Sequence, residues 1–404
     1  MKILFITTLY PGYKEQSRQK TSYALHYFAK DWVKSGHEVN VIRLWPKYSK
    51  LFSFTNKGKQ ADEYGNEAEF NLDGVSVNRQ IINKYPKIDY LSKDIQEVYN
   101  YITKNIKNDF IPDVIVCHMI NPSLYIASLL KEELNKPLML VMHHSDISQL
   151  QSMKKRLNKY RHAEQFIDRI GFRSHKLYKE FGTLPILNNN LLKDAFIINS
   201  GINRKDIISI EKIRQKIMSP PKIIFIASSM IPLKNIDVVI KAFDEISKKH
   251  NIKLRIAGDG PEREKLLGLA KKSNAQENIE FLGYIPREAV MEHMEKSDIY
   301  VMVSSPETFG LVYVEAMGNG CITIGSKGEG IDGTIINGEN GFLSEPGNIH
   351  DLKLTLLKVL RLDKTEREKI TNNALETAKN QTQEQLAMYY LEVMKETIDN
   401  YKNN

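Results

Sequence analysis

The sequence lacks the marks of a secreted, disulfide-bonded or membrane-spanning protein. Its 404 residues include two cysteines, Cys117 and Cys321, each in or beside an apolar run. We therefore expect buried, inert thiols in a reducing compartment, and no metal site built from cysteines. No run of about 18 apolar residues is present, so we expect no membrane-spanning helix. The N-terminus lacks the apolar core and cleavage site of a signal peptide, and we interpret it as a strand.

A fingerprint for nicotinamide or flavin cofactors is also missing. The first predicted strand, residues 2–9, is followed by a loop with Pro11 and Gly12 that contains no G-x-G-x-x-G pattern. A Rossmann oxidoreductase needs those glycines so that the cofactor pyrophosphate can approach the backbone. The sequence therefore disfavours that class of enzyme.

Positive charge is in excess but is not concentrated. Lys and Arg number 57 against 49 Asp and Glu, which gives a net charge of +8. The basic residues are spread along the chain, so a nucleic-acid partner gains little support. A phosphorylated substrate or an anionic lipid surface fits the excess equally well.

Strands and helices are predicted to alternate through both halves of the chain. This alternation favours an α/β fold with two doubly wound parallel sheets, and 42% hydrophobic residues suffice for two cores. Pro220 and Pro221 cannot continue a helix, so we place a linker at residues 206–221, between domains at residues 1–205 and 222–380. We expect the ligand at the carboxyl ends of the strands, in a cleft between the sheets.

The stretch from residue 298 to 320 carries the strongest signal for chemistry. An apolar strand is predicted at its start, Gly310 allows a turn, and residues 311–317 form a predicted helix. The first amides of such a helix have no partners within it and favour an anion. Glu307 and Glu315 flank this helix start, where they would bind hydroxyls on either side of a phosphate. The alternative is that Glu307 caps the helix and Glu315 lies on a solvated face.

The segments P-E-T-F-G and E-A-M-G-N-G in this stretch closely resemble the Glu-x7-Glu signature of retaining glycosyltransferases with the GT-B fold, in particular family 4. The resemblance implies that Glu307 contacts the donor sugar and that Glu315 holds the nucleotide ribose. It also implies that four backbone amides face the diphosphate: those of Phe309, Gly310, Leu311 and Val312. A C-terminal helix at residues 381–404 would cross back onto the first domain, as in GT-B enzymes.

Two further segments resemble family motifs with one departure that matters. H-H-S-D at residues 143–146 is similar to H-G-x-D, which implies that His143 approaches the donor sugar, although a structural histidine is the alternative. S-S-M-I-P-L-K is similar to G-R-L-x-x-x-K, so Lys234 keeps the family's lysine while Ser229 replaces its arginine. A missing cation beside a leaving diphosphate would cost several kcal/mol of transition-state stabilisation. Arg287, Lys327 or a residue of the first domain would have to compensate.

The remaining implied contacts concern the nucleotide. Gly258, in a G-D-G-P turn after a strand, would form a backbone wall of the pocket. Gly283 and Tyr284 are similar to positions that border the base in family 4, with aromatic core packing as the alternative for Tyr284. No Asp-x-Asp pair stands at a strand end near these residues. We therefore expect neither a metal nor a cofactor, the nucleotide sugar being the donor substrate.

Taken together, the resemblance implies a hexosyltransferase that uses a nucleotide diphosphate sugar, with UDP as the expected nucleotide. The acceptor would be a hydroxyl of a polysaccharide or lipid-linked oligosaccharide, in the synthesis of a capsule or another cell-surface polymer. A non-catalytic GT-B partner, which the Ser229 replacement favours, and a sugar-nucleotide epimerase of the same shape are the alternatives.

Two less specific segments complete the prediction. Residues 47–71 are polar and weakly patterned, and we expect a long loop there. Residues 153–165 form a predicted amphipathic helix whose polar face is basic. We hypothesise a cytoplasmic protein in which this helix contacts anionic lipid at the inner face of the membrane, a solvated face being the alternative. The basic residues are Lys154, Lys155, Arg156, Lys159 and Arg161.

Overall fold

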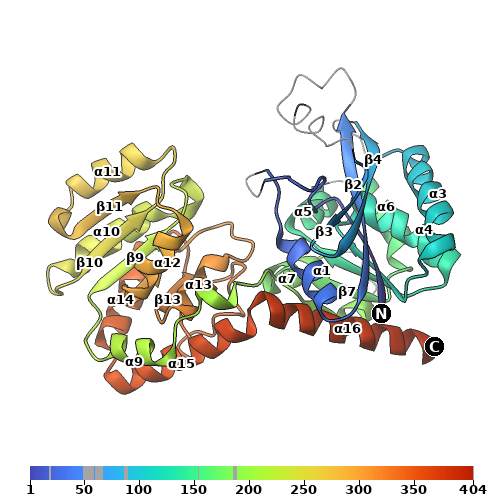
Figure 1. The fold of residues 1–404 in the computed structure, drawn as a ribbon. Coiled ribbons are helices and arrows are strands. Elements are labelled where there is room, and N and C mark those ends of the chain that lie inside the picture. The colour runs from blue at the N-terminus through green and yellow to red at the C-terminus, as the bar shows by residue number, and fades with distance from the viewer. Residues whose placement is uncertain are drawn as a thin grey trace. The chain divides into compact units, whose positions relative to one another are not determined.

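A computed structural model describes residues 1–17, 20–48, 59, 67–85, 90–152, 154–184 and 189–403. The chain divides into two compact units. Unit 1 comprises Met1–Arg173, Leu177–Ser200 and Leu386–Asn404, and unit 2 comprises Ser174–Lys176 and Gly201–Gln385. Each unit is an α/β body built around one sheet (Figure 1).

The sheet of unit 1 has eight strands in the order β3-β4-β2-β1-β5-β6-β7-β8. Every pairing is parallel except that of β3 with β4. The strands are β1 (Lys2–Thr7), β2 (Glu38–Tyr48), β3 (Glu69–Leu72), β4 (Val75–Lys84), β5 (Val114–His118), β6 (Leu138–Met142), β7 (Arg169–Phe172) and β8 (Phe196–Ile197).

Helices connect and cover these strands. They are α1 (Ala24–Lys34), α3 (Ser92–Asp109), the π-helical turn η2 (Ile120–Leu124), α4 (Tyr125–Leu134), α5 (His144–Ser152), α6 (Lys154–Glu164), α7 (His175–Gly182), α8 (Asn189–Lys193) and α16 (Gln383–Asn403). α7 begins within Ser174–Lys176 and α16 begins at the end of Gly201–Gln385, and both of these segments group with unit 2.

Both faces of the unit 1 sheet are buried, as alternate residues of β1 demonstrate. Leu4 and Ile6 pack into one core and Ile3 and Phe5 into another on the opposite face. A parallel sheet covered on both sides produces the continuous apolar runs that predicted these strands. Both cores exclude water from the strand backbones.

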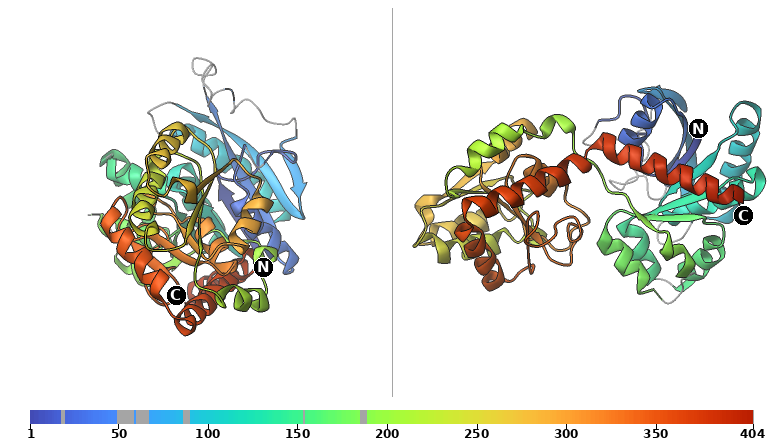
Figure 2. Two further views of the ribbon diagram at one scale, coloured as in Figure 1. Left: turned by 90° about the vertical axis from the view of Figure 1, so that its left-hand side faces the viewer. Right: turned by 90° about the horizontal axis from the view of Figure 1, so that it is seen from below.

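The C-terminal helix α16 supplies part of one of these cores. From Leu386 onward it packs with α1, and the indole N–H of Trp32 donates to the carbonyl oxygen of Ala387 at 3.1 Å. Seen from below in Figure 2, α16 runs across the sheet of unit 1. Unit 1 therefore contains the last residues of the chain as well as the first.

The sheet of unit 2 has six parallel strands in the order β11-β10-β9-β12-β13-β14. Its strands are β9 (Ile223–Ala227), β10 (Lys253–Ala257), β11 (Ile279–Gly283), β12 (Ile299–Val301), β13 (Ile322–Ser326) and β14 (Phe342–Ser344). The order reverses between β9 and β12. In open α/β sheets ligands bind beside such a reversal, at the carboxyl ends of the strands.

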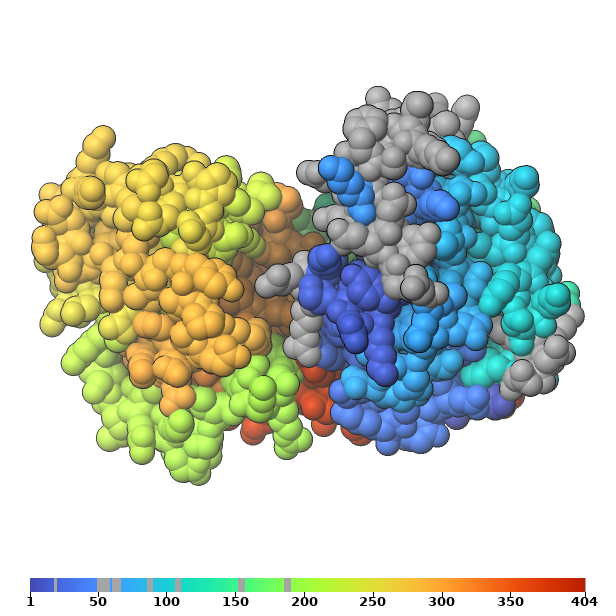
Figure 3. Space-filling view, turned by 45° about the horizontal axis from the view of Figure 1, so that its top comes forward, coloured from blue at the N-terminus to red at the C-terminus, as the bar shows by residue number. Residues whose placement is uncertain are grey.

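Both faces of this sheet are buried, since Ile224 and Phe225 of β9 pack into two different cores. In the space-filling view of Figure 3, the yellow and orange part of the chain forms much of the visible surface of unit 2. The helices are α9 (Ile210–Ile217), α10 (Ile236–Ser247), α11 (Arg263–Lys271), α12 (Arg287–Glu295), α13 (Leu311–Gly318), α14 (Ile349–Arg361) and α15 (Lys364–Asn380). Three single turns also belong to this unit: η3 (Arg204–Asp206), η4 (Pro232–Lys234) and η5 (Gln276–Asn278).

Two predicted segments differ from the structure or lie outside it. The loop predicted for residues 47–71 is wrong at both ends, because β2 extends to Tyr48 and β3 begins at Glu69; residues 49–58 and 60–66 lie outside the described part. The segment 206–221, predicted as a linker, contains the helix α9 (Ile210–Ile217) and groups with unit 2. Both buried thiols are confirmed, since Cys117 and Cys321 are fully buried.

Candidate active site

The carboxylate of Glu307 lies in the loop that follows β12, beside the point where the strand order of unit 2 reverses. Its Oε2 accepts from the ammonium of Lys234 at 2.8 Å and from the hydroxyl of Ser304 at 3.1 Å. Lys234 ends the turn that follows β9, so this ion pair joins the two strands on either side of the reversal. Both side chains are largely buried, which keeps the pair out of bulk water.

A second carboxylate, Glu329, fixes the backbone of the same loop. It accepts from the amide N–H of Glu307 at 2.7 Å, from the hydroxyl of Ser305 at 2.7 Å and from the ammonium of Lys176 at 2.6 Å. Burial raises the pKa of Glu329, but these hydrogen bonds outweigh burial and the pKa is lowered. Glu329 is therefore an ionised anchor that holds Glu307 in place.

The helix start that follows Glu307 has the features of an anion-binding end. Gly310 stands before α13 in the left-handed region, with φ +79°, and none of the described side chains caps the first turn. Glu307 instead accepts from the amide of Thr308 at 3.1 Å, so it is not the cap of α13. Free amides at this end favour a negatively charged ligand.

The carboxylate of Glu315, on α13, is buried rather than solvated. Only 6% of this residue is exposed, and the guanidinium of Arg287 forms an ion pair with it at 2.6 Å. Arg287 also pairs with Asp206 at 2.8 Å. Burial raises the pKa of Glu315, and the positive charge of Arg287 opposes that rise. The cation allows a carboxylate to remain at a position from which water is largely excluded.

A cavity of about 390 Å³ opens beside Glu315. It is lined by Ala227, Ser228, Ser229, Ala257, Gly258, Asp259, Tyr284, Ile285, Arg287, Val290, Met291, Val312 and Glu315. Loops after β9, β10 and β11 meet α12 and α13 here. Its volume lies within the range of small-ligand pockets, and its walls combine apolar surface with a few polar groups.

Five residues singled out from the sequence line this cavity together: Ser229, Gly258, Tyr284, Val312 and Glu315. Tyr284 is 81% exposed, so its ring is not core packing and lies open to a ligand.

The other predicted residues of unit 2 lie nearby without lining the cavity. The carbonyl oxygen of Gly283 accepts from the amide of Gly258 at 2.7 Å, which holds the two loops together. Phe309 is 7% exposed and packs in the core of unit 2. Gly310 and Leu311 form the turn into α13 that carries Val312 to the cavity wall.

Of the cations considered as substitutes for the missing arginine, one reaches the cavity. Arg287 is among its lining residues, whereas Lys327 pairs with Glu345 at 2.8 Å. Among the described residues that line the cavity, Arg287 is the single cation and Asp259 and Glu315 are the anions.

His143 lies in unit 1, where it follows β6 at the carboxyl edge of the sheet. Its Nε2 is 3.0 Å from Nδ1 of His118, and Tyr390 contacts the other nitrogen of His118 at 3.3 Å. Burial, and then the charge of Arg173, lowers the pKa of His143 to about 3, so the imidazole is neutral. The amide of His143 donates to Asp146 at 2.8 Å, which fixes the turn into α5.

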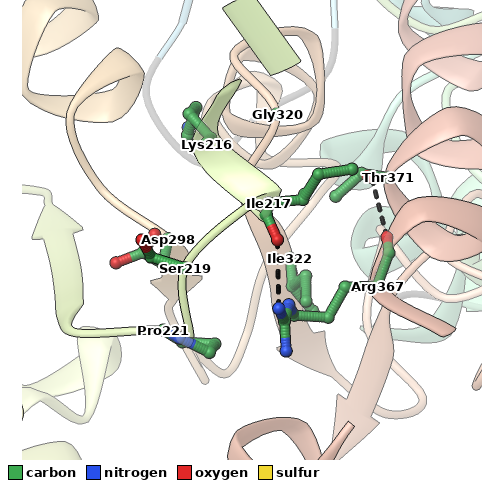
Figure 4. A pocket seen from close by; sticks show the side chains of 9 residues that line it. All are labelled: Lys216, Ile217, Ser219, Pro221, Asp298, Gly320, Ile322, Arg367 and Thr371. Atoms are coloured by element: carbon green, nitrogen blue, oxygen red, sulfur yellow. Dashed lines mark hydrogen bonds between the residues drawn. The ribbon is translucent and has the colours of Figure 1, made fainter. Parts of the chain in front are cut away.

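A second, much smaller cavity of about 10 Å³ lies beside α9 (Figure 4). Arg367 of α15 donates there to the carbonyl oxygen of Ile217 at 3.0 Å, and Thr371 donates to the carbonyl oxygen of Arg367 at 2.7 Å. This space is about that of one water molecule. It therefore belongs to the attachment of α9 to α15 and not to a ligand site.

Within the described ranges, no group of three or more His, Cys, Asp or Glu side chains is arranged to hold a metal ion. None of the helices in those ranges has the length and apolar character needed to cross a bilayer.

The two Rossmann-like units are similar to solved structures with the GT-B fold, and the family match and the names of the curated relatives identify this chain as a glycosyltransferase. Residues 209–377 match the model of the family described as glycosyl transferases group 1. The prediction of a GT-B enzyme is therefore confirmed, while its assignment to family 4 stays a prediction.

Individual relatives and solved structures are similar to this chain over most of its length. N-acetyl-alpha-D-glucosaminyl L-malate synthase of Bacillus anthracis is 28% identical over 327 residues, which cover 75% of this chain and 83% of that protein. The structure of Anabaena HepE in complex with UDP has a TM-score of 0.66 at 18% identity and covers 98% of this chain and 100% of that one. The apo form of the lipopolysaccharide outer core galactosyltransferase WaaB has a TM-score of 0.66 at 16% identity, with 98% and 99% covered.

Sequence reasoning missed the anchors of this site. Glu329, Lys176 and Asp206 were not predicted to contribute, although each forms an ion pair with a site residue or its anchor. Glu329 lies in the loop after β13, and its contact with the amide of Glu307 joins residues 22 positions apart in the chain. The local sequence does not indicate which backbone group this carboxylate would bind.

Proposed function

We propose that this glycosyltransferase transfers a hexose-type sugar from a UDP-sugar, with retention of the anomeric configuration, to a hydroxyl of a polysaccharide or lipid-linked oligosaccharide. The observation that carries the proposal is the cavity of about 390 Å³ that ends at the buried carboxylate of Glu315. A buried carboxylate is a strong acceptor for ribose hydroxyls, and an exposed aromatic ring beside it suits a base. The cell-surface polymer, such as a capsule, is part of the proposal.

Each site residue has a proposed role. Glu315 accepts from the ribose, and Tyr284 and the backbone at Gly283 border the base. Lys234 and the start of α13 neutralise the diphosphate, which suits an ammonium and a set of backbone amides. Glu307, held by Glu329, accepts from hydroxyls of the transferred sugar. The proposal adds His143, as a neutral imidazole, to the groups that position that sugar.

The relatives support the donor class. Anabaena HepE was crystallised with UDP, and WaaB is named a galactosyltransferase of the lipopolysaccharide outer core. The Bacillus anthracis relative is named for a product of N-acetylglucosamine and L-malate, a small acceptor. We favour a glycan acceptor. Transfer of the sugar to a small hydroxy acid would contradict this choice of acceptor.

Thermal unfolding in the presence of UDP, GDP, CDP and their sugars tests the identity of the donor. A ligand that binds only the folded state raises the unfolding temperature, and it does so more when its affinity is higher. We expect UDP compounds to give the largest shift, and Glu307→Gln and Glu315→Gln to reduce donor affinity and turnover. A larger shift with GDP or CDP would contradict the choice of nucleotide. NMR of the product would show the anomeric configuration, and conversion of the donor without an acceptor would indicate an epimerase.

We also propose that α6 contacts anionic lipid at the inner face of the cell membrane. In the structure Tyr160 of this helix is fully buried, while Lys159 lies 3.9 Å from the ring centre of Tyr125; the side chains of residues 154–156 lie outside the described part. Co-sedimentation with phosphatidylserine vesicles is expected for the intact chain and should weaken when the five basic residues are neutralised. Equal recovery with neutral and anionic vesicles would refute contact through charge.

A further inference from the structure

The cavity beside Glu315 has few positive groups for a pocket that we propose to bind a nucleoside diphosphate. Its described lining residues include the carboxylates of Asp259 and Glu315 and, as cation, only Arg287. A nucleoside diphosphate carries at least two negative charges and needs positive groups within a few ångströms. In the segment that resembles the family motif G-R-L-x-x-x-K, this chain has Ser229 at the position of the arginine. Lys234, which we propose to neutralise part of the diphosphate charge, does not line the cavity, and its ammonium also donates to Glu307.

Arg287 occupies a position that its own helix does not favour. It is the first residue of α12, where the helix dipole repels a cation and attracts an anion. Two carboxylates, those of Asp206 and Glu315, compensate for this placement. The two ion pairs therefore hold a cation at a helix start that also lines the cavity.

The contacts of Arg287 allow it to change partners. Its side chain is 54% exposed, whereas those of Asp206 and Glu315 are 11% and 7% exposed. The guanidinium is therefore accessible to a ligand from the solvent side, whereas the two carboxylates are largely enclosed by protein. A ribose whose hydroxyls donate to Glu315 replaces the guanidinium as the partner of that carboxylate.

We propose that Arg287 is a diphosphate-binding residue of this chain. When the ribose hydroxyls bind Glu315, the guanidinium of Arg287 moves from Glu315 to the donor phosphates. Asp206 keeps the arm at the cavity during the exchange, and the guanidinium supplies the positive charge that Ser229 cannot. This inference rests on the proposed function, since it takes a UDP-sugar as the ligand. It assigns the compensating cation to a helix that the family motif does not include.

Isothermal titration calorimetry with uridine, UMP and UDP separates the phosphate contribution from the nucleoside contribution. For Arg287→Gln we expect UDP affinity to fall roughly 10- to 100-fold, as for the loss of a charge-assisted hydrogen bond, with little change for uridine. Arg255→Gln is the matched control: Arg255 pairs with Glu280 at 2.9 Å on neighbouring strands and does not line the cavity. It removes the same charge and should leave all three affinities unchanged.

Ser229→Arg supplies the second test. In the Arg287→Gln background it should restore UDP affinity, whereas in the wild type its effect should be smaller, because Arg287 already neutralises the phosphates. An equal loss of uridine and UDP affinity in Arg287→Gln would overturn the inference and show that Arg287 acts through Glu315 alone. A wild-type chain that binds uridine and UDP with equal affinity would also overturn it. Failure of the wild type to bind any uridine compound would instead refute the proposed function.

Discussion

Gly310 controls the helix start at which the sugar and diphosphate groups are proposed to meet. With φ +79° it adopts a conformation that residues with a Cβ rarely occupy. A Cβ added there would lie 2.4 and 2.6 Å from two atoms of the Tyr313 ring. That ring is fully buried, and its hydroxyl donates to the carbonyl oxygen of Met302 at 2.9 Å and lies 3.2 Å from the hydroxyl of Ser304. The ring therefore has no space into which it could withdraw.

The cost of Gly310→Ala has two parts. The left-handed backbone costs about 1–2 kcal/mol for alanine. Overpacking against a buried ring adds about 1–3 kcal/mol. Gly347→Ala isolates the first part, because Gly347 has φ +75° and no atom within 4 Å of the added Cβ. We expect Gly310→Ala to destabilise unit 2 more than Gly347→Ala by the overpacking cost.

Urea unfolding measured by circular dichroism tests this difference. Tryptophan fluorescence serves as an internal control, because Trp32 and Trp45 both lie in unit 1. Displacement of Tyr313 also disturbs Ser304, which donates to Glu307, so Gly310→Ala should weaken UDP binding and Gly347→Ala should not. Equal destabilisation by the two variants, or unchanged UDP affinity in Gly310→Ala, would refute the argument from the Tyr313 contact.

The remaining predictions concern the role of Glu329, the dependence of transfer on metal ions and the stability of unit 1 at low pH. Glu329→Gln should lower turnover more than UDP affinity, because the carboxylate holds the Glu307 backbone; kinetics that change only the KM for the donor would contradict this. EDTA should leave transfer unchanged, and collapse of transfer that added Mg²⁺ reverses would show metal dependence. Burial lowers the pKa of His143 to about 3 and that of His118 well below its usual value. Below about pH 6.5 the unfolded chain therefore binds more protons than the folded chain, and unit 1 should lose stability. Burial raises the pKa of Asp146 to about 7, so protonation of Asp146 in the folded state opposes this loss of stability. Asp146→Asn should therefore steepen the fall in unfolding free energy by up to about 1.4 kcal/mol per pH unit, measured by tryptophan fluorescence during urea unfolding. An unchanged slope would contradict the raised pKa of Asp146.

Much of the fold followed from local pattern. The apolar residues at the N-terminus and at the start of the stretch from residue 298 predicted strands, and the structure has β1 at Lys2–Thr7 and β12 at Ile299–Val301. The helix after Gly310 was also predicted, because a glycine at a turn and the following apolar residues act within a few positions. The sequence failed where the pattern was weak, as at the ends of β2 and β3.

The sequence by itself also determined the candidate residues Glu307 and Glu315, because their spacing along one strand, turn and helix is a local property. Only the tertiary structure decided their partners. Glu315 meets Arg287, and Glu307 is held by Glu329 and paired with Lys234, residues that are far apart in the chain. These contacts arise because the sheet order brings the carboxyl ends of β9, β11, β12 and β13 to one edge. That order is set by the burial of whole strands and helices, which no single stretch of sequence records.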